Sequence, residues 1–414
     1  MVQLNRHLVG SWELVTGVGI RGPYYRAVDT VCFPHTLHNS LETCKEQGIE
    51  VGMLTGPHFK DFCNHSNGLM SSAQSNGKAL WRQYMGSSYP SPGNTRWGTH
   101  YETMGYFLPT LLTSDPDFIG PQLRPTFDEE HIPFPMTYAN WVSLHFSGNG
   151  GTLGGNHIKY LFNTLVPGND EFDPRLLALT EFEAAVAVDV SISIRYAIYQ
   201  SEGDGPLAFL LSDILESVHD SFEAHFDGMT YPNVLLSLKK NVAGGFHPTL
   251  PDTQPQSPAL HDAWVTYGQD LARRCRRHFY EKVYDHTQTP LYRELALFDP
   301  LFFSSKEASW NTQDTVADSL RAWFAICITG DKELIAEQDL DLLAAEVPAM
   351  RHRCQEALAN VNNFMGSTKK FDVRCNFVEL FWFKAHASLK YPVPTWSKYA
   401  SKLMLLQPLK FRYC

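Results

Sequence analysis

The most constraining feature of the sequence is a long apolar stretch that begins after Asp173-Pro174 and ends at SEGDGP, residues 201–206. Proline is tolerated at the first position of a helix, where its missing N–H costs no hydrogen bond. The apolar side chains that follow point in most directions around a helix: Leu176, Leu177, Leu179, Phe182, Ala184, Ala185, Val186, Ala187, Val188 and Val190. A helix that is apolar on most sides is a buried one. Arg175 to about Tyr199 is therefore predicted to be a central, buried helix.

Proline and glycine mark further helices along the chain. Pro206 precedes a segment with one apolar stripe, and Pro232 opens NVLLSLKKNV, which stops at Gly244-Gly245. Apolar residues at helical spacing predict more helices over residues 257–284, 316–328, 330–363 and 373–389. No βαβ alternation, clear hairpin pattern or internal repeat is visible. The predicted fold class is all-α, with one large helical domain over residues 136–414.

The first third of the chain is irregular, with recurring clusters of Gly, Pro, Ser and Asn such as SSAQSNG and GSSYPSPGNTRWG. Such clusters are typical of turns and loops. Short helices are expected between them, at His38–Gln47 and Met104–Leu112. Residues 1–135 are therefore predicted to form a small, loop-rich helical domain that caps the large one.

Composition narrows the class of protein. The chain has 414 residues, 43% of them hydrophobic, and a formal net charge of −10. The acidic balance argues against nucleic-acid binding, and no apolar run is long enough to span a bilayer. The first residues lack the basic-then-apolar order of a signal peptide, and the eight cysteines have no framework spacing. We expect a cytoplasmic protein with free thiols and neither nucleic-acid nor membrane partners.

His352 lies in the middle of the predicted helix over residues 330–363. Its neighbours at helical spacing are mostly small, namely Ala345, Ala349 and Ala359, with Glu356 as the one large member. Small side chains around an imidazole leave room for a broad, flat group such as an iron porphyrin to approach the helix. The alternative is an ordinary surface histidine between two arginines.

A second cluster has residue types that bind zinc. Cys32, His35, His38 and Cys44 lie close together in the N-terminal third. Structural zinc sites usually place their ligands in two close pairs separated by a longer gap, which these residues do not do. Loop histidines and buried thiols are the alternative interpretation.

Five segments, in order, resemble the indoleamine 2,3-dioxygenase family and its PrnB-like relatives. PFPMTYANWV is similar to the family's pocket-entry segment, and LALTEFEAAVAVDVS to the helix over the distal side of the haem. MTYPNVLLSLKKNVAGG and PQSPALHDAWVTYG match two further family segments in spacing. Gly330-Asp331 matches a Gly-Asp pair that precedes the family's proximal histidine by the interval that leads here to His352. The resemblance covers roughly residues 132–368.

The resemblance implies an all-α domain that encloses one haem b, with His352 as the axial ligand of the iron. Asp262 is then a candidate acceptor for the other nitrogen of the imidazole, which would raise the basicity of the ligand. The distal side, where O2 is activated and an indole or related aromatic is held, would be formed by two segments. Their implied catalytic residues are Tyr138, Trp141, Leu179, Thr180 and Glu183.

The sequence differs from the family pattern at several positions that the resemblance implies to contact the substrate. Lys240 stands where the family has an arginine that grips the substrate carboxylate, and lysine cannot make that planar contact. Leu235 replaces an aromatic residue. The glycine-rich loop that closes on the substrate corresponds at best to Gly366, Ser367 and Thr368. These changes favour an indole or other tryptophan-derived aromatic over tryptophan itself, in a biosynthetic pathway of secondary metabolism.

The sequence also differs from the family pattern at positions that the resemblance implies to contact the haem. The arginine that meets a haem propionate falls on Ala349, so Arg351 or Arg353 would have to replace it. His386, which follows the aromatic run ELFWFKAH, is the alternative axial ligand. An electron donor that keeps the iron reduced is an expected partner. The alternatives to an oxygenase are a PrnB-like enzyme that rearranges an aromatic ring and a non-catalytic helical haem or binding protein.

Overall fold

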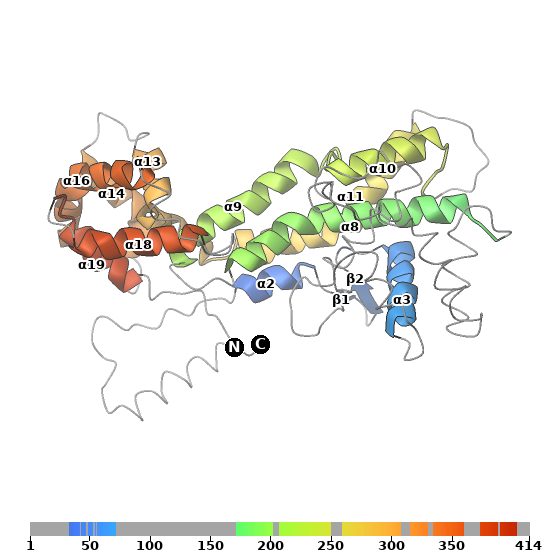
Figure 1. Cartoon of the computed structure of the whole chain (residues 1–414), viewed down its shortest axis with the longest axis horizontal. Coiled ribbons are helices and arrows are strands. Elements are labelled where there is room, and N and C mark those ends of the chain that lie inside the picture. Colours follow the sequence, from blue (N-terminus) through green and yellow to red (C-terminus); the bar gives the residue numbers. More distant parts are fainter. Residues whose placement is uncertain are drawn as a thin grey trace, which may run out of the picture. The chain divides into compact units, whose positions relative to one another are not determined.

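A computed structural model describes the protein over residues 33–41, 43–46, 49–52, 54, 56–71, 171–201, 207–249, 259–307, 315–329, 334–359, 373–387 and 390–403. Helices dominate these ranges, and a short two-stranded hairpin accompanies them (Figure 1). The all-α fold class is confirmed. Within the described part of the chain, every helix is too short or too polar to cross a bilayer.

The chain divides into two compact units, each built from separate segments. Unit 1 comprises Met1–Thr36, Ala197–Ser217 and Tyr280–Cys414, and unit 2 comprises Leu37–Tyr196 and Val218–Phe279. Some of the boundaries fall inside helix α8 (Pro174–Ser201), inside helix α9 (Leu207–His225) and between α11 (Ala259–Phe279) and the π-helix η4 (Tyr280–Tyr284). The domain boundary predicted between residues 135 and 136 lies outside the described residues, and unit 2 joins segments from both sides of it.

Unit 2 is organised around α8. Its other elements, besides α11 and the end of α9, are β1 (Thr43–Glu46), β2 (Ile49–Gly52), α3 (Pro57–Ser71) and α10 (Pro232–Ala243). Figure 1 shows α8 running beside α11, and the Phe182 ring of α8 lies 4.7 Å from the Trp264 ring of α11. Residues 178–191 of α8 are all buried, as predicted for a central helix.

Helix α8 begins where the sequence predicts. The Oδ1 atom of Asp173 accepts hydrogen bonds from the backbone N–H groups of Arg175 and Leu176, at 2.9 and 3.1 Å. The first N–H groups of a helix have no carbonyl partner inside the helix. A side-chain oxygen of the residue just before the helix can accept their hydrogen bonds. The short polar residue before the proline therefore fixes the start of the helix.

The predicted helix at His38–Gln47 is wrong. Helix α2 (Phe33–Asn39) ends at Asn39, and residues 43–46 form strand β1, which pairs antiparallel with β2. The pairing joins Thr43 to Gly52 and Glu46 to Ile49, which leaves Gln47 and Gly48 between the strands. A two-residue connection that contains glycine is typical of a hairpin, and β-branched residues favour strands.

Unit 1 consists of short helices around an aromatic core. Besides η4, the end of α8 and the first part of α9, its elements are α12 (Thr289–Leu295), the 3-10 helix η5 (Ala296–Phe298), α13 (Pro300–Glu307), α14 (Val316–Trp323), α15 (Ala325–Thr329), the 3-10 helix η6 (Glu337–Asp339), α16 (Leu340–Ala359), α18 (Val373–Ala387) and α19 (Pro394–Leu403). At its centre lies the Phe298 ring. Its centroid is within 6.0 Å of the ring centroids of Phe209, Phe324, Trp382 and Trp396. Both tryptophan N–H groups donate to backbone carbonyls, which allows the indoles to be buried.

The predicted helices of unit 1 are confirmed with changes at their ends. The segment 316–328 forms two helices, α14 and α15, because Phe324 leaves the helical conformation. Helix α16 begins at Leu340 rather than at residue 330, and it continues through Pro348 as one helix. Helix α19 was not predicted.

Buried or half-buried carboxylates cap helices that are distant in the sequence. Helices α3, α10 and α19 all begin with proline, and the residues before them, Gly56, Tyr231 and Val393, have no carboxylate or hydroxyl suited to a cap. In each case a carboxylate of another helix accepts from the free N–H groups: Glu183 from Phe59, Asp189 from Asn233 and Val234, and Glu346 from Thr395 and Trp396. Glu294 of α12 does the same at the start of α15. Anions are stabilised at helix starts, so these contacts fix which elements pack together.

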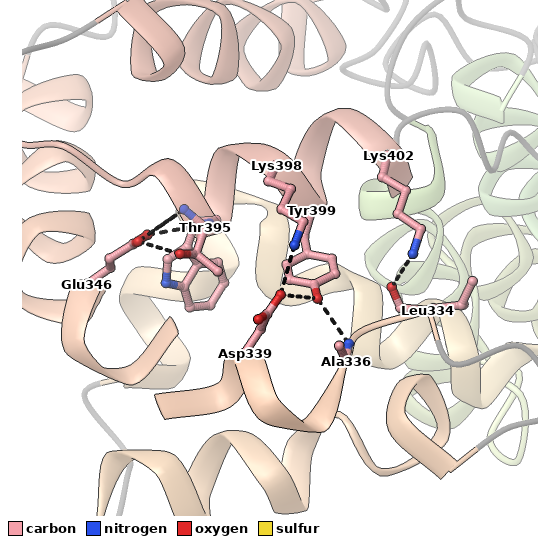
Figure 2. A network of polar contacts seen from close by, with 9 residues as sticks. Leu334, Ala336, Asp339, Glu346, Thr395, Lys398, Tyr399 and Lys402 are labelled. Atoms are coloured by element: carbon pink, nitrogen blue, oxygen red, sulfur yellow. Dashed lines mark hydrogen bonds and ion pairs between the residues drawn. The ribbon is translucent and has the colours of Figure 1, made fainter. Parts of the chain in front are cut away.

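Helix α19 is held by a polar network along one side (Figure 2). Asp339 accepts from Lys398 Nζ at 2.8 Å and from the Tyr399 hydroxyl at 2.7 Å, and the same hydroxyl accepts from the Ala336 N–H at 3.0 Å. Lys402 donates to the Leu334 carbonyl. The network joins α19 to η6 and to the segment before it.

Candidate functional site

The predicted distal residues on α8 lie inside unit 2. Leu179, Thr180 and Glu183 are all buried, and the Thr180 hydroxyl donates to the Leu176 carbonyl within the helix. Tyr138 and Trp141, the other two predicted catalytic residues, lie outside the described residues. Among the predicted residues on α8, Glu183 has the largest number of hydrogen-bond partners.

Glu183 is the hub of a buried polar cluster. Its carboxylate is fully buried and accepts from His58 Nδ1 at 2.7 Å, from the Phe59 N–H at 2.8 Å, and from the Tyr267 hydroxyl in a short hydrogen bond. Gly56 makes room for it, because a Cβ atom at that position would overlap the Glu183 carboxyl group. The cluster joins the start of α3 to the middle of α8 and of α11.

The cluster perturbs both of its titratable partners. The hydrogen bond to Glu183 raises the pKa of His58 above its usual 6.5, against the opposing effect of burial. Burial raises the pKa of Tyr267 well above its usual range, and the nearby Glu183 carboxylate raises it further. The His58 side chain is 32% exposed, so an imidazole held through Nδ1 by a buried carboxylate faces solvent with part of its ring. That arrangement suits proton transfer at the other nitrogen.

The predicted substrate-binding Lys240 already has an ionic partner. Its Nζ contacts both oxygens of Glu181, at 2.9 and 2.7 Å. The Glu181 side chain is 1% exposed and the Lys240 side chain 40%. Burial raises the pKa of Glu181 to about 7, although Lys240 opposes that shift. Leu235, the other predicted substrate contact described, is half-buried on the same helix.

Asp262, predicted to support the axial histidine, lies near the start of α11 in unit 2. Its side chain is 85% exposed, and its partner is the neighbouring His261, at 3.3 Å. His352, Arg351 and Arg353 belong to unit 1. The structure brings Leu179, Thr180, Glu183, Leu235 and Lys240 into unit 2 with Asp262, and it places the three α16 residues together in the other unit.

His352 is exposed on the outer face of α16. The face through it keeps its small side chains, with Ala345 exposed and Ala349 half-buried. The Tyr391 ring lies nearly parallel to the imidazole, with centroids 5.3 Å apart and an angle of 20° between the planes. An accessible imidazole can bind a metal ion, and the small side chains beside it leave room for a flat group such as a haem.

The two arginines beside His352 differ in their contacts. Arg351 is held by the Glu307 carboxylate through Nε, at 3.1 Å to each oxygen, and through a further short contact from Nη2. Arg353 is buried with its guanidinium over the Phe381 ring, 5.7 Å from the centroid, and burial lowers its pKa. Its Nε atom is buried without a hydrogen-bond partner. Arg353 therefore keeps an unpaired donor that an anionic group such as a haem propionate could take, whereas Arg351 is already paired.

Other predicted site residues are not described. Gly366, Ser367 and Thr368 lie outside the described residues, as does Cys32 of the zinc cluster. His386 lies in α18, whose backbone is described at that position. Within the part of the chain that the structure describes, the only group of three or more side chains arranged for a metal ion is Glu216, His219 and Asp220 on α9. Cys63, Cys275, Cys327 and Cys354 are free and buried.

Comparison with known proteins identifies no relative. No protein-family model, curated protein or solved structure matches the chain.

Three residues of these clusters, His58, Tyr267 and Glu181, were not predicted from the sequence as members of a site. A carboxylate inside an apolar helix must find a polar partner, and both Glu181 and Glu183 carry that signal within LALTEFEAAVAV. The signal predicts that partners exist. It does not predict which partners, because His58 lies 125 residues from Glu183 and Lys240 lies 59 residues from Glu181.

Proposed function

We propose that the protein is a haem-dependent oxygenase that acts on an indole or related aromatic substrate, with His352 as the axial ligand of haem b iron. The observation that carries the proposal is the accessible imidazole of His352 on a small-residue face of α16, next to a buried arginine with an unpaired Nε. The order of the family-like segments in the sequence supports it. When bound, the haem would supply O2 activation.

The residues of the protein would have separate tasks. His352 would bind the iron as a neutral imidazole, and Arg353 would pair with a propionate. Tyr391 packs against the imidazole and would restrict its rotation. In unit 2, Glu183 holds His58 through Nδ1, so His58 would exchange a proton with solvent at Nε2. The contacts of Glu183 with the Phe59 N–H and with Tyr267 keep that carboxylate in place.

The test is the visible absorption spectrum of protein produced with ample haem precursor. We expect a Soret band in the wild type that is lost or shifted in His352→Ala. His261→Ala is the matched control, because this histidine is also exposed and has only a weak contact with Asp262. A band that survives in His352→Ala and disappears in His386→Ala would move the axial ligand to α18. A wild type without a Soret band would rule out the haem proposal.

Two further measurements separate haem binding from turnover. Arg353→Met should weaken haem binding more than Arg351→Met, because Arg351 is already paired with Glu307. O2 consumption with indole, followed in an oxygen electrode with a reductant present, tests the oxygenase. A stable haem spectrum without O2 consumption for any indole tested would instead favour a haem protein that rearranges or senses its ligand.

A further inference from the structure

Tyr267 of α11 donates its phenolic hydrogen to the carboxylate of Glu183 inside unit 2. That carboxylate is fully buried and also accepts from His58 Nδ1, at 2.7 Å. The His58 side chain is 32% exposed. Three side chains from three helices therefore form a chain of hydrogen bonds that runs from a half-buried phenol, through a buried carboxylate, to an imidazole in contact with solvent.

The Tyr267 phenol keeps its proton in the resting protein. Burial raises its pKa well above the usual range, and the nearby Glu183 carboxylate raises the pKa further, so the hydroxyl does not ionise near neutral pH. Removal of one electron changes this, because the radical cation of a phenol is a very strong acid. Its proton then passes to a base at hydrogen-bond distance, and Glu183 is such a base. A tyrosine with this partner is easier to oxidise than a tyrosine without one.

Tyr292 of α12 shows the opposite arrangement. Its side chain is 1% exposed, and no described residue forms a hydrogen bond with its hydroxyl. Oxidation of Tyr292 would leave a proton and its positive charge in a buried place without an acceptor, which is strongly unfavourable. The two tyrosines therefore differ in the step that oxidation requires.

Aromatic side chains pack against the Tyr267 ring. Its centroid lies 6.1 Å from the ring of Trp264 and 6.2 Å from the ring of Phe182, and both of these rings are fully buried. They shield part of the Tyr267 ring from water, which slows the decay of a radical formed there. The indole N–H of Trp264 donates to the Phe246 carbonyl, at 2.8 Å. Of this aromatic pair, Tyr267 is the member whose proton faces a carboxylate.

We infer that Tyr267 is a redox-active tyrosine whose oxidation is coupled to proton transfer through Glu183 and His58. Its reaction partner is a one-electron oxidant, such as an organic peroxyl radical or a high-valent metal complex. One electron passes from the phenol to the oxidant, the O–H bond of Tyr267 breaks, and the proton moves to Glu183. The step needs no haem and does not rest on the proposed function.

His58 completes the balance of charge. Its hydrogen bond to Glu183 favours the imidazolium, which lies beside the charged carboxylate. Once Glu183 has taken the phenolic proton, that stabilisation is lost and the imidazolium releases its Nε2 proton to solvent. The phenol, carboxylate and imidazolium become a neutral radical, a neutral carboxyl group and a neutral imidazole. One electron and one proton have then left the protein.

The experiment is oxidation of the full chain with hexachloroiridate(IV), a one-electron oxidant, followed by rapid freezing and EPR spectroscopy. We expect a tyrosyl radical signal in the wild type, most of which is lost in Tyr267→Phe. A nitroso spin trap with mass spectrometry of the peptides should locate the radical at residue 267. Tyr292→Phe is the matched control, because it removes a buried hydroxyl that has no acceptor. The signal should persist in that variant.

Two substitutions test the proton path. Glu183→Gln replaces the carboxylate with an amide, which is a very weak base, so formation of the radical should slow at least about tenfold. His58→Gln should also slow it, by a smaller factor, because the carboxylate remains but the group that releases the proton is gone. This second variant leaves the contact of Glu183 with the Phe59 N–H in place and therefore tests the path even if Glu183→Gln does not fold. His261→Gln, at an exposed histidine, should have no effect.

Three outcomes would overturn the inference. The first is a wild type without a tyrosyl signal, and the second is a signal of equal intensity in Tyr267→Phe. The third is radical formation at the wild-type rate in His58→Gln and in Glu183→Gln. The Soret band is measured separately, so failure of this inference and failure of the haem proposal are distinguishable.

Discussion

The carboxylate of Glu183 and the imidazole of His58 lie 125 residues apart in the chain and meet at 2.7 Å in unit 2. The same carboxylate accepts the N–H of Phe59 at the start of α3 and the hydroxyl of Tyr267. Glu183 therefore has a structural task, capping α3, and positions a half-exposed imidazole at the same time. The two tasks can be separated by experiment, because the first concerns stability and the second concerns proton transfer.

Glu183→Gln should destabilise the protein. The amide keeps the shape of the side chain but loses its charge, and it brings a donor group towards the donors of Phe59 and Tyr267. We expect the free energy of unfolding to fall by about 1–3 kcal/mol, the usual effect of losing buried hydrogen bonds to a charged group. Denaturation in urea, followed by circular dichroism, measures the change.

The matched control for this variant is Asp270→Asn. Asp270 makes an exposed ion pair with Arg273 on α11, and such pairs contribute about 0.5 kcal/mol or less. A loss in Glu183→Gln no larger than in Asp270→Asn would show that the buried cluster does not stabilise unit 2.

Gly56→Ala should be destabilising because of Glu183. The backbone of Gly56 does not have a positive φ angle, so alanine is compatible with its conformation. An added Cβ atom would overlap the Glu183 carboxyl group, which is buried and held by three partners. We expect a loss of about 1–3 kcal/mol in the free energy of unfolding, as for other overpacked sites.

A double-mutant cycle tests this reason. In a Glu183→Ala background the carboxyl group is gone, so the added methyl group of Gly56→Ala should cost little. The coupling between the two substitutions should exceed about 1 kcal/mol. Additive effects would mean that the strain at Gly56 arises from another contact.

His58 should titrate above its usual value. The hydrogen bond to Glu183 stabilises the protonated imidazole in the folded protein, so the folded-state pKa lies above 6.5. The stabilisation is fully present below the unfolded pKa and is lost as the pH rises through the folded pKa. A histidine titration by NMR measures this pKa in the wild type, in Glu183→Gln, where it should fall, and in Asp270→Asn, where it should not. A wild-type value at or below 6.5 would contradict the hydrogen bond.

Glu346→Gln should loosen the start of α19. Glu346 accepts the N–H groups of Thr395 and Trp396, at 3.0 and 3.2 Å, and the Thr395 hydroxyl at 2.6 Å (Figure 2). Loss of its charge at a helix start should reduce the free energy of unfolding by about 1 kcal/mol. Hydrogen exchange of the Thr395 and Trp396 amides should accelerate more than in Glu337→Gln, a substitution at an exposed glutamate. Equal exchange rates in the two variants would exclude Glu346 as the cap.

The sequence predicted the helical class and most helices of the described part because their signals are local. Pro174, Pro232 and the glycines after α10 mark helix ends by their backbone chemistry, and the apolar residues of α8 require burial whatever surrounds them. The hairpin was missed because two four-residue strands have little periodicity. Helix α19 was missed because its start is stabilised by Glu346, which lies 49 residues away from Thr395.

What the sequence by itself determined is the set of groups that needed partners: carboxylates in an apolar helix, prolines that open helices, and a histidine on a small-residue face. Only the tertiary structure decided which residues are those partners. Glu183 meets His58, Glu181 meets Lys240, and Asp189 meets the start of α10. The physical reason is that hydrogen bonds and ion pairs act over a few ångströms, whereas these residues are brought to that distance only by the packing of whole helices.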